Sequence, residues 1–263
     1  MSLQQTPEEI KACCAAAYQR DIVALVLGDS YHPGGLDLTR KLGRALGLQP
    51  GQHVLDVASG PGTTAFLLAD EFGVDVDGVD LAEQSVTAAN ALAAQRGVSE
   101  HVRFRVGDAE RLPLGDASAD AAVCECAFCT FPDKATAAAE MARVLRPGGR
   151  LGITDVVVDR GRLDAELQTL AGWVACLADA RPAAEYEALL GAAGLRLVQQ
   201  ESHDHALARM IEQIDARLVA FRLAEVPALA GIDFDRARQR TALAAKAVED
   251  GIAGYVLMVA EKA

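Results

Sequence analysis

The sequence predicts an α/β fold in which a doubly wound, mostly parallel sheet is covered by helices on both faces. Between residues 53 and 158, short apolar segments typical of strands alternate with segments typical of helices. Such alternation needs crossover connections, which carry helices to both faces of a parallel sheet. A glycine-rich turn follows the first of these strands, and a Pro-Gly-Gly turn precedes the last. The chain length of 263 residues is sufficient for one such domain with additions.

The N-terminal part of the chain precedes this alternation. Residues 6–27 are expected to form a helix, because a threonine can cap its first turn and a proline follows directly. Glycines between residues 28 and 35 end this helix, and a second helix is expected over 36–47. We therefore expect an N-terminal helical cap over residues 1–35 and an α/β domain with helical additions over 36–263.

The other elements are assigned from runs of apolar residues and from the Gly and Pro residues between them. After residue 160 the chain is predicted to be helical around Trp173 and Cys176. The last two strands flank a helical block, which suits an antiparallel edge of the sheet. In chain order, strands are expected at 53–59, 74–80, 102–108, 119–128, 150–158, 195–203 and 254–262, helices at 63–73, 85–97, 135–145 and 184–193, and a mostly helical block at 205–250.

Composition and charge restrict the classes of partner. Hydrophobic residues make up 51% of the chain, and 37 acidic residues outnumber 25 basic ones, for a net charge of −12. Nucleic acids and anionic membranes require a basic surface, so we expect neither as a partner and expect a small-molecule substrate instead. No apolar run reaches the roughly 20 residues of a membrane-spanning helix, and the N-terminus lacks a signal pattern. We therefore expect a cytoplasmic location.

Six cysteines without a secretory signal are expected to be reduced thiols. Cys124, Cys126 and Cys129 follow the fourth strand, and ligands of such sheets bind beyond the carboxyl ends of the strands. These cysteines are therefore expected at or near a cleft. The alternative is that they fill the core as small apolar side chains. A zinc or iron–sulfur site lacks a fourth nearby ligand, so no metal site is expected.

The turn after the first strand can approach a ligand closely. Gly60 and Gly62 lack a Cβ atom, and the following helix offers free N–H donors. Asp80 ends the second strand 20 residues after Gly60, where a carboxylate can accept hydrogen bonds from both ribose hydroxyls. Folds that bind nicotinamide cofactors and folds that bind adenosyl nucleosides share these features. Asp56 lies four residues before Gly60, and Asp108 ends the third strand at the same edge as Asp80.

These residues in this order, with the segment 143–150 before the fifth strand, resemble class I S-adenosylmethionine-dependent methyltransferases over residues 36–160. The resemblance implies a Rossmann-like fold, S-adenosyl-L-methionine as cofactor, and in-line methyl transfer that depends on alignment and exclusion of water. The family has glycine where this chain has Ala58. The resemblance implies that Ser59, Gly60 and Gly62 contact the methionine and ribose parts of the cofactor, and that Asp56 binds its amino-acid end. It implies that Asp80 binds the ribose hydroxyls and Leu81 lies beside the adenine. It also implies that Asp108 binds the adenine amino group and Ala109 an adenine ring nitrogen; Cys124 is expected among these cofactor-binding residues as well.

A narrower resemblance concerns the methyl acceptor. Cys126 precedes the segment 131–134, and Cys176 precedes a helix that ends in Ala-Gly-Leu, which resembles the arsenite methyltransferases. The resemblance implies that Cys126 and Cys176 are a catalytic pair of thiolates that hold trivalent arsenic. Soft thiolates suit such a centre and leave its lone pair free as the nucleophile. Cys13 and Cys14 are candidates for a third thiolate, although their spacing differs from that of the family.

Three functions remain open at this point. The first is a methyltransferase (EC 2.1.1) for a small substrate, with trivalent arsenic or another thiophilic species as the favoured acceptor. The second is an O-, N- or C-methyltransferase of an organic metabolite, whose pocket the cysteines line. The third is a non-catalytic metalloid-binding protein. Glu125, Tyr31 and His32 are further candidates for the site, and a nicotinamide oxidoreductase has no use for Asp108.

Overall fold

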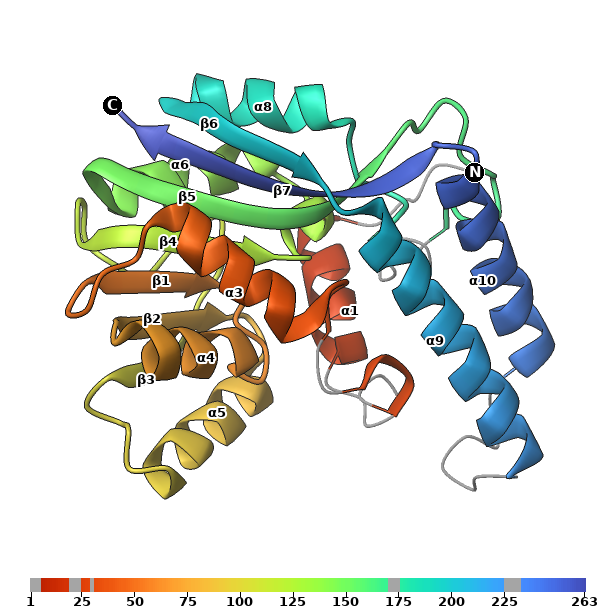
Figure 1. Ribbon diagram of the computed structural model, residues 1–263, viewed down its shortest axis with the longest axis horizontal. Helices are drawn as coiled ribbons and strands as arrows, with labels where there is room; N and C mark the ends of the chain where they lie inside the picture. The colour runs from red at the N-terminus through yellow and green to blue at the C-terminus, as the bar shows by residue number, and fades with distance from the viewer. Residues whose placement is uncertain (1–5, 19–24, 29–30, 170–175, 225–232) are drawn as a thin grey trace.

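Seven strands form one mixed sheet with helices against both faces (Figure 1). The computed structural model describes residues 6–18, 25–28, 31–169, 176–224 and 233–263. Neighbouring strands follow the order β3-β2-β1-β4-β5-β7-β6; β1 to β5 are parallel, and β7 is antiparallel to β5 and β6. The predicted sheet and its antiparallel edge are thus confirmed. The strands are β1 (His53–Val57), β2 (Asp75–Asp80), β3 (Val102–Val106), β4 (Ala119–Glu125), β5 (Leu145–Val158), β6 (Leu195–Ser202) and β7 (Ala253–Lys262).

The helices divide between the two faces of the sheet. One core layer contains side chains of α3, α4 and α5, together with the pair α9 and α10, and the other contains those of α6 and α8. Side chains along β4 alternate between the layers: Val123 belongs to the first, and Cys124 to the second. The helices are α1 (Pro7–Tyr18), α3 (Gly35–Leu46), α4 (Thr63–Phe72), α5 (Glu83–Gln95), α6 (Lys134–Val144), α8 (Ala183–Ala192), α9 (Asp204–Leu223) and α10 (Phe234–Glu249), with a 3-10 turn at Phe128–Thr130.

The strand order reverses between β1 and β4, the two strands at the centre of the parallel part. In doubly wound sheets, ligands bind outside the carboxyl ends of the strands at such a reversal. The residues that follow β1 and β4 are the glycine-rich turn and Cys126. The topology therefore places these two sequence features beside each other.

One predicted helical segment differs from the structure, and another is described only in part. Of the helix predicted over 6–27, residues 7–18 and 25–27 are helical, and the residues between them lie outside the described part of the chain. Residues 161–169 form turns where a helix was predicted, and Trp173 lies outside the described residues. The physical reason is that Asp159 and Asp164 accept hydrogen bonds from backbone N–H groups two residues later, at 3.1 and 2.8 Å. Such bonds compete with helix formation.

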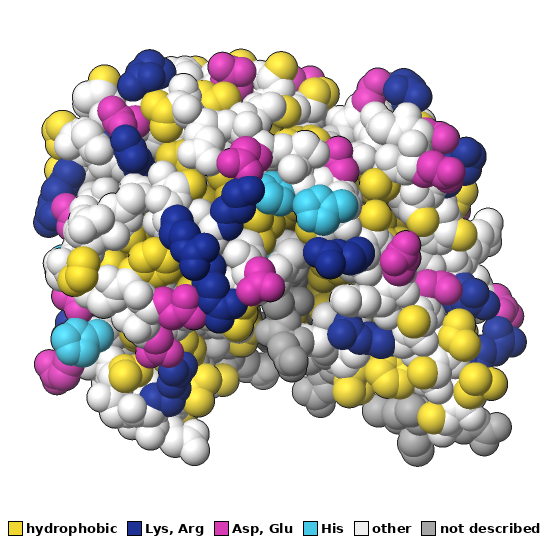
Figure 2. Space-filling model, in the orientation of Figure 1, with side chains coloured by type: hydrophobic (Ala, Val, Ile, Leu, Met, Phe, Trp, Pro, Cys, Tyr) yellow, Lys and Arg dark blue, Asp and Glu magenta, His cyan; other side chains and the backbone are white. Residues whose placement is uncertain are grey.

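Lys and Arg side chains are interspersed with Asp and Glu on the face shown in Figure 2. Several of them form ion pairs; Arg40, for example, binds Asp37 at 2.7 Å and Glu71 at 2.8 Å. Among the described residues, no helix combines the length and the apolar character that a membrane span requires.

Gly62 is predicted to be required for packing at the start of α4. It has a φ of +84°, and a Cβ atom added there would overlap the ring of Phe104. We expect Gly62→Ala to lower the free energy of unfolding by about 1–2 kcal/mol for the left-handed conformation and by about 1–3 kcal/mol more for the clash. Gly97, with a φ of +70° and open space around it, is the matched control because Gly97→Ala carries only the first cost. Equal losses for the two variants in urea titrations would contradict this.

Candidate active site

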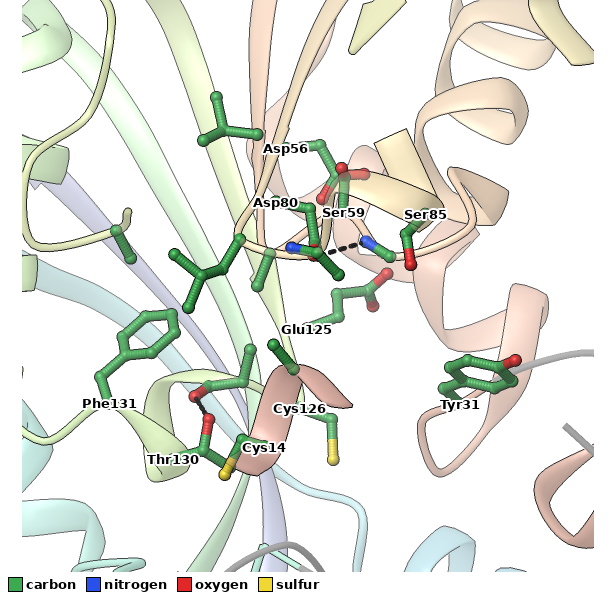
Figure 3. A pocket seen from close by; sticks show the side chains of 18 of the residues that line it. Cys14, Tyr31, Asp56, Ser59, Asp80, Ser85, Glu125, Cys126, Thr130 and Phe131 are labelled. Carbon is green, nitrogen blue, oxygen red and sulfur yellow. Dashed lines mark hydrogen bonds between the residues drawn. The ribbon is translucent and has the colours of Figure 1, made fainter. Parts of the chain in front are cut away.

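The carboxylate of Asp80 links the end of β2 to the turn after β1. Its oxygens accept hydrogen bonds from the backbone N–H groups of Gly60 and Ala82, both at 2.8 Å (Figure 3). Burial raises the pKa of Asp80, and these two hydrogen bonds oppose the rise. Ala58, in the same turn, has a φ of +59°. It therefore occupies the left-handed region that a glycine would occupy without strain.

A cavity of about 190 Å³ lies at the carboxyl ends of the strands. Most of the predicted cofactor-binding residues line it; these are Asp56, Ser59, Gly60, Asp80, Leu81, Asp108 and Ala109. Cys126, Glu125, Tyr31 and His32 line it as well, and α1 contributes Lys11, Cys14 and Ala15.

Two residues predicted to contact the cofactor lie elsewhere. Cys124 is completely buried among the side chains that pack α6 and α8 onto the sheet, so it is a core residue and does not line the cavity. Gly62 is also absent from the cavity lining, and its lack of a side chain accommodates Phe104 instead. Both positions are adjacent to lining residues, which explains why sequence order alone did not distinguish them.

The carboxyl group of Glu125 is held by hydroxyl groups from three elements. Its Oε2 accepts hydrogen bonds from Thr39 on α3 at 2.9 Å and from Thr64 on α4 at 2.7 Å, and its Oε1 accepts one from Thr154 on β5 at 3.2 Å. Nε2 of His32 lies 3.5 Å from Oε2. The side chain of Glu125 is only 4% exposed. These contacts fix its orientation at the wall of the cavity.

Asp56 is buried beside this network. Burial raises its pKa well above the ordinary value, and the charges of Glu125 and Asp80 raise it further. Its Oδ2 atom is buried without a hydrogen-bond partner among the described residues, and so is Oγ of the nearby Ser59. Buried polar atoms are normally hydrogen-bonded. Two such atoms at one cavity wall indicate a place where a polar group of a ligand binds.

The structure brings Cys126 and Cys176 together, although 50 residues separate them in the sequence. Their Sγ atoms are 3.7 Å apart. Cys126 has a φ of +53° and Cys176 a φ of +63°, a conformation rare for residues other than glycine and often found at functional sites. Hydrogen bonding to Cys176 and burial raise the pKa of the Cys126 thiol.

Two further thiols lie around this pair. Cys129 is buried and interacts with Cys176, and its N–H donates to the carboxylate of Asp155 at 3.0 Å. Burial, together with the neighbouring Cys176, raises the pKa of Asp155 to about 7. Cys14 lines the cavity from α1, and burial raises the pKa of its thiol to about 12. Within the part of the chain that the structure describes, no group of three or more His, Cys, Asp or Glu side chains is arranged to hold a metal ion.

Sequence reasoning missed the residues that reach the site from distant elements. The ammonium group of Lys11 on α1 binds Asp108 at 2.8 Å and Glu110 at 2.5 Å, across almost 100 residues of sequence. The threonines around Glu125 were missed as well. A lysine or threonine on an amphipathic helix carries no signal of its own, because the same residues are common on exposed faces.

Comparison with known proteins gives consistent results. Residues 55–153 match the family described as "Methyltransferase domain". The chain is 39% identical over 122 residues to the O-methyltransferase cnsE of Penicillium expansum, covering 46% of this chain and 44% of that protein. It is 34% identical over 161 residues to an arsenite methyltransferase of Halobacterium salinarum, covering 60% of this chain and 41% of that protein. The chain thus spans less than half the length of these two relatives.

The fold is also similar to solved structures. The cyclopropane synthase MmaA2 from Mycobacterium tuberculosis aligns with a TM-score of 0.82 and 19% identity, covering 100% of both chains. At this level of identity, the similarity concerns the fold alone.

The ion pairs of Lys11 are predicted to hold α1 against the cavity. We expect Lys11→Gln to release the helix and to accelerate alkylation of Cys14 by iodoacetamide about tenfold, the equivalent of roughly 1.4 kcal/mol for two partly buried ion pairs. Peptide mass spectrometry over time measures the rate. Lys41→Gln is the matched control, because Lys41 pairs with Glu201 and does not line the cavity. An unchanged Cys14 rate in Lys11→Gln would show that other contacts hold α1.

Proposed function

We propose that this chain, whose residues 55–153 match the family described as "Methyltransferase domain", is a class I S-adenosylmethionine-dependent methyltransferase that transfers a methyl group from S-adenosyl-L-methionine to a small molecule. The proposal is supported by the cavity at the reversal of strand order and by three acidic residues at the carboxyl ends of neighbouring strands: Asp56 in β1, Asp80 at the end of β2 and Asp108 just after β3. The sulfonium group of the cofactor supplies an activated methyl group. The contribution of the protein is to align this group with the acceptor and to exclude water.

The residues of the cavity fit such a cofactor. A Cβ atom added at Gly60 would meet nothing within 4 Å, so open space lies above the turn where a nucleoside could bind. We assign Asp80 to the ribose hydroxyls and Asp108 with Ala109 to the adenine, as the resemblance implies. Asp56 and Ser59 have the unpartnered polar atoms that the amino-acid part of the cofactor could satisfy.

For the methyl acceptor we propose trivalent arsenic, or another thiophilic centre, held by Cys126 and Cys176. The observation that supports it is the 3.7 Å distance between their Sγ atoms; Cys126 lines the cofactor cavity, and Cys176 is buried next to it without lining the cavity. Each thiol would replace a hydroxide of arsenite, and its proton would leave with that hydroxide as water, so that both sulfurs bond to arsenic. The arsenic lone pair, kept free by the two sulfurs, would accept the methyl group that the sulfonium group supplies; the carbon–sulfur bond would break, and the positive charge would pass from sulfur to arsenic.

A third thiol is offered by Cys14. It lines the cavity from α1, whereas Cys129 is buried behind the pair and does not line it. Cys14 is therefore the better placed of the two to reach a substrate that enters through the cavity.

A second candidate function is methylation of a hydroxyl group of an organic metabolite. The observation that favours it is the pairing of His32 with Glu125 at 3.5 Å, since a histidine oriented by a carboxylate can serve as a general base. The 39% identity to an O-methyltransferase over 122 residues agrees with this alternative. In that case the cysteines are part of the pocket wall.

Methyl transfer to arsenite tests the thiol pair. We expect the wild-type protein, with reductant present, to transfer tritiated methyl groups to arsenite. The variants Cys126→Ser and Cys176→Ser should each lose about 100-fold or more, because loss of a direct ligand exceeds the 10- to 100-fold effect of losing an outer-shell partner.

Binding of S-adenosylhomocysteine by each variant is the matched control, and it should persist because the thiols lie beyond the nucleoside part of the cavity. Undiminished arsenite methylation in both variants would refute the thiol pair. Methylation of phenols without methylation of arsenite would favour the second function, and tight arsenite binding without turnover would favour a binding protein.

A further inference from the structure

Lys134 and Asp179 form a buried ion pair between the two segments that carry the thiols. Nζ of Lys134 donates to Oδ2 of Asp179 at 2.6 Å, and the two side chains are only 5% and 7% exposed. Arg181 and Arg160 contact Oδ1 of Asp179, at 3.0 and 3.5 Å. Neither Lys134 nor Asp179 lines the cofactor cavity. Cofactor binding therefore does not account for this pair.

Each member of the pair belongs to a segment that carries one of the thiols. Lys134 is the first residue of α6, and its Nζ also donates to the carbonyl of Phe131, at 2.9 Å. Phe131 and Cys126 both line the cavity (Figure 3). Asp179 lies three residues after Cys176, and the stretch between them is buried but belongs to neither a helix nor a strand. One ammonium group thus binds both the cavity wall that contains Cys126 and the stretch that contains Cys176.

The stretch that contains Cys176 depends on side-chain contacts for its position. Beyond its end, the N–H of Val158 in β5 donates to the carbonyl of Arg181 at 3.2 Å, which fixes the chain to the sheet. Cys176 itself has a φ of +63°, and its thiol donates to the carbonyl of Cys126 at 3.5 Å. A positive φ persists only where the surroundings enforce it. The ion pair of Asp179, three residues away, is therefore part of what holds Cys176 in this conformation.

Burial of such a pair is not a simple gain in stability. The cost of removing two charges from water offsets their attraction, and two apolar side chains of similar volume are often at least as stabilising. An ion pair differs from an apolar contact in its geometry, because an ammonium group must lie within hydrogen-bond distance of its carboxylate. The pair of Lys134 and Asp179 therefore specifies where the stretch after Cys176 lies.

We propose that this ion pair positions Cys176 against Cys126, so that both sulfurs can bond to one thiophilic atom; the inference rests on the proposed acceptor. Two thiols bind such an atom more strongly than one only if their separation is held, because the second bond is then formed within the protein. Lys134 and Asp179 do not touch the acceptor or the cofactor in this assignment. They are positioning residues, comparable with the outer-shell partners that orient the ligands of a metal ion.

Binding of phenylarsine oxide tests this without turnover. Its arsenic forms bonds to two thiols with release of one water, so its affinity depends on how the thiols are placed. Equilibrium dialysis of the reduced protein, with bound arsenic measured by mass spectrometry, gives the Kd. We expect Lys134→Met to raise this Kd about 10- to 100-fold, the range for loss of an outer-shell partner. In the background Cys176→Ser the same change should alter the Kd less than about twofold, because Lys134 acts through Cys176.

Controls separate positioning from a general loss of stability. Arg143 forms ion pairs in the last turn of the same helix, so Arg143→Met is the matched control. It should lower the free energy of unfolding and leave the Kd of phenylarsine oxide within about twofold. Asp179→Asn should raise the Kd in the same direction as Lys134→Met, and it serves as the second variant if Lys134→Met does not fold, as judged by circular dichroism.

The possible outcomes distinguish this inference from the proposed acceptor. The double variant Cys126→Ser/Cys176→Ser measures binding by the other cysteines; if the wild-type protein binds no more tightly, the proposed acceptor site and this inference both fail. If binding needs both cysteines but Lys134→Met leaves the Kd unchanged, or raises it equally in Cys176→Ser, the inference alone is overturned. If Lys134→Met weakens binding selectively and arsenite is not methylated, the inference stands and only the methyl transfer is wrong.

Discussion

The burial of acidic side chains at the carboxyl edge of the sheet is the constraint on which the site depends. Asp56, Asp80, Glu125 and Asp155 all lie there, and among the described residues none is in an ion pair with Lys or Arg. A buried carboxylate costs several kcal/mol unless its surroundings replace the lost water. Backbone N–H groups do so for Asp80 and Asp155, and threonine hydroxyls do so for Glu125. Asp56 alone keeps an unpartnered oxygen.

This pattern explains why elements far apart in the sequence meet at the edge. The threonines that stabilise Glu125 come from α3, α4 and β5, so their hydroxyl groups tie both helices to the end of β4. A hydrogen bond to a charged group contributes about 1.5–3 kcal/mol, more than one between neutral groups. The wall of the cavity is therefore rigid before any ligand binds, which reduces the free-energy cost of ordering it upon binding.

Backbone strain is concentrated at the same place. Ala58, Cys126 and Cys176 all have positive φ values, and Ala117 is the only other non-glycine residue among those described that does. Such conformations cost of order 1–3 kcal/mol each and persist only where the surroundings enforce them. At Cys126 the enforcing contact is the hydrogen bond from its N–H to Thr154 in the neighbouring strand. The strain turns the thiol toward Cys176.

The sheet and the acidic residues at its edge could be predicted from sequence because each depends on local patterns. Strand and helix alternation gives the parallel sheet, and parallel strands bring Asp56, Asp80 and Asp108 to one edge regardless of packing detail. The segment 161–169 could not be predicted in the same way, because its apolar residues suit a helix while two aspartates favour turns.

The cysteines show a second limit of sequence patterns. In a continuing strand, Cys124 and Cys126 would point to the same face, two residues apart. The strand ends at Glu125, however, and the positive φ of Cys126 turns its side chain to the opposite layer from Cys124. One of the two is therefore a core residue and the other lines the cavity. The contact between Lys11 and Asp108 joins residues that are 97 positions apart in the sequence. It depends on tertiary packing, so no local sequence pattern predicts it.

The raised pKa values of the thiols bear on how a thiophilic substrate could be bound in the proposed reaction. A buried thiol that keeps its proton resists oxidation and alkylation, because the thiolate is the reactive form. Once formed, the thiolate of a thiol with a high pKa is also the stronger electron donor. In that reaction a thiophilic centre would displace the proton of Cys126 and gain a strong ligand, whereas weaker electrophiles leave this thiol protonated. The same burial that makes Cys126 unreactive on its own would thus favour a thiophilic acceptor in the proposed reaction.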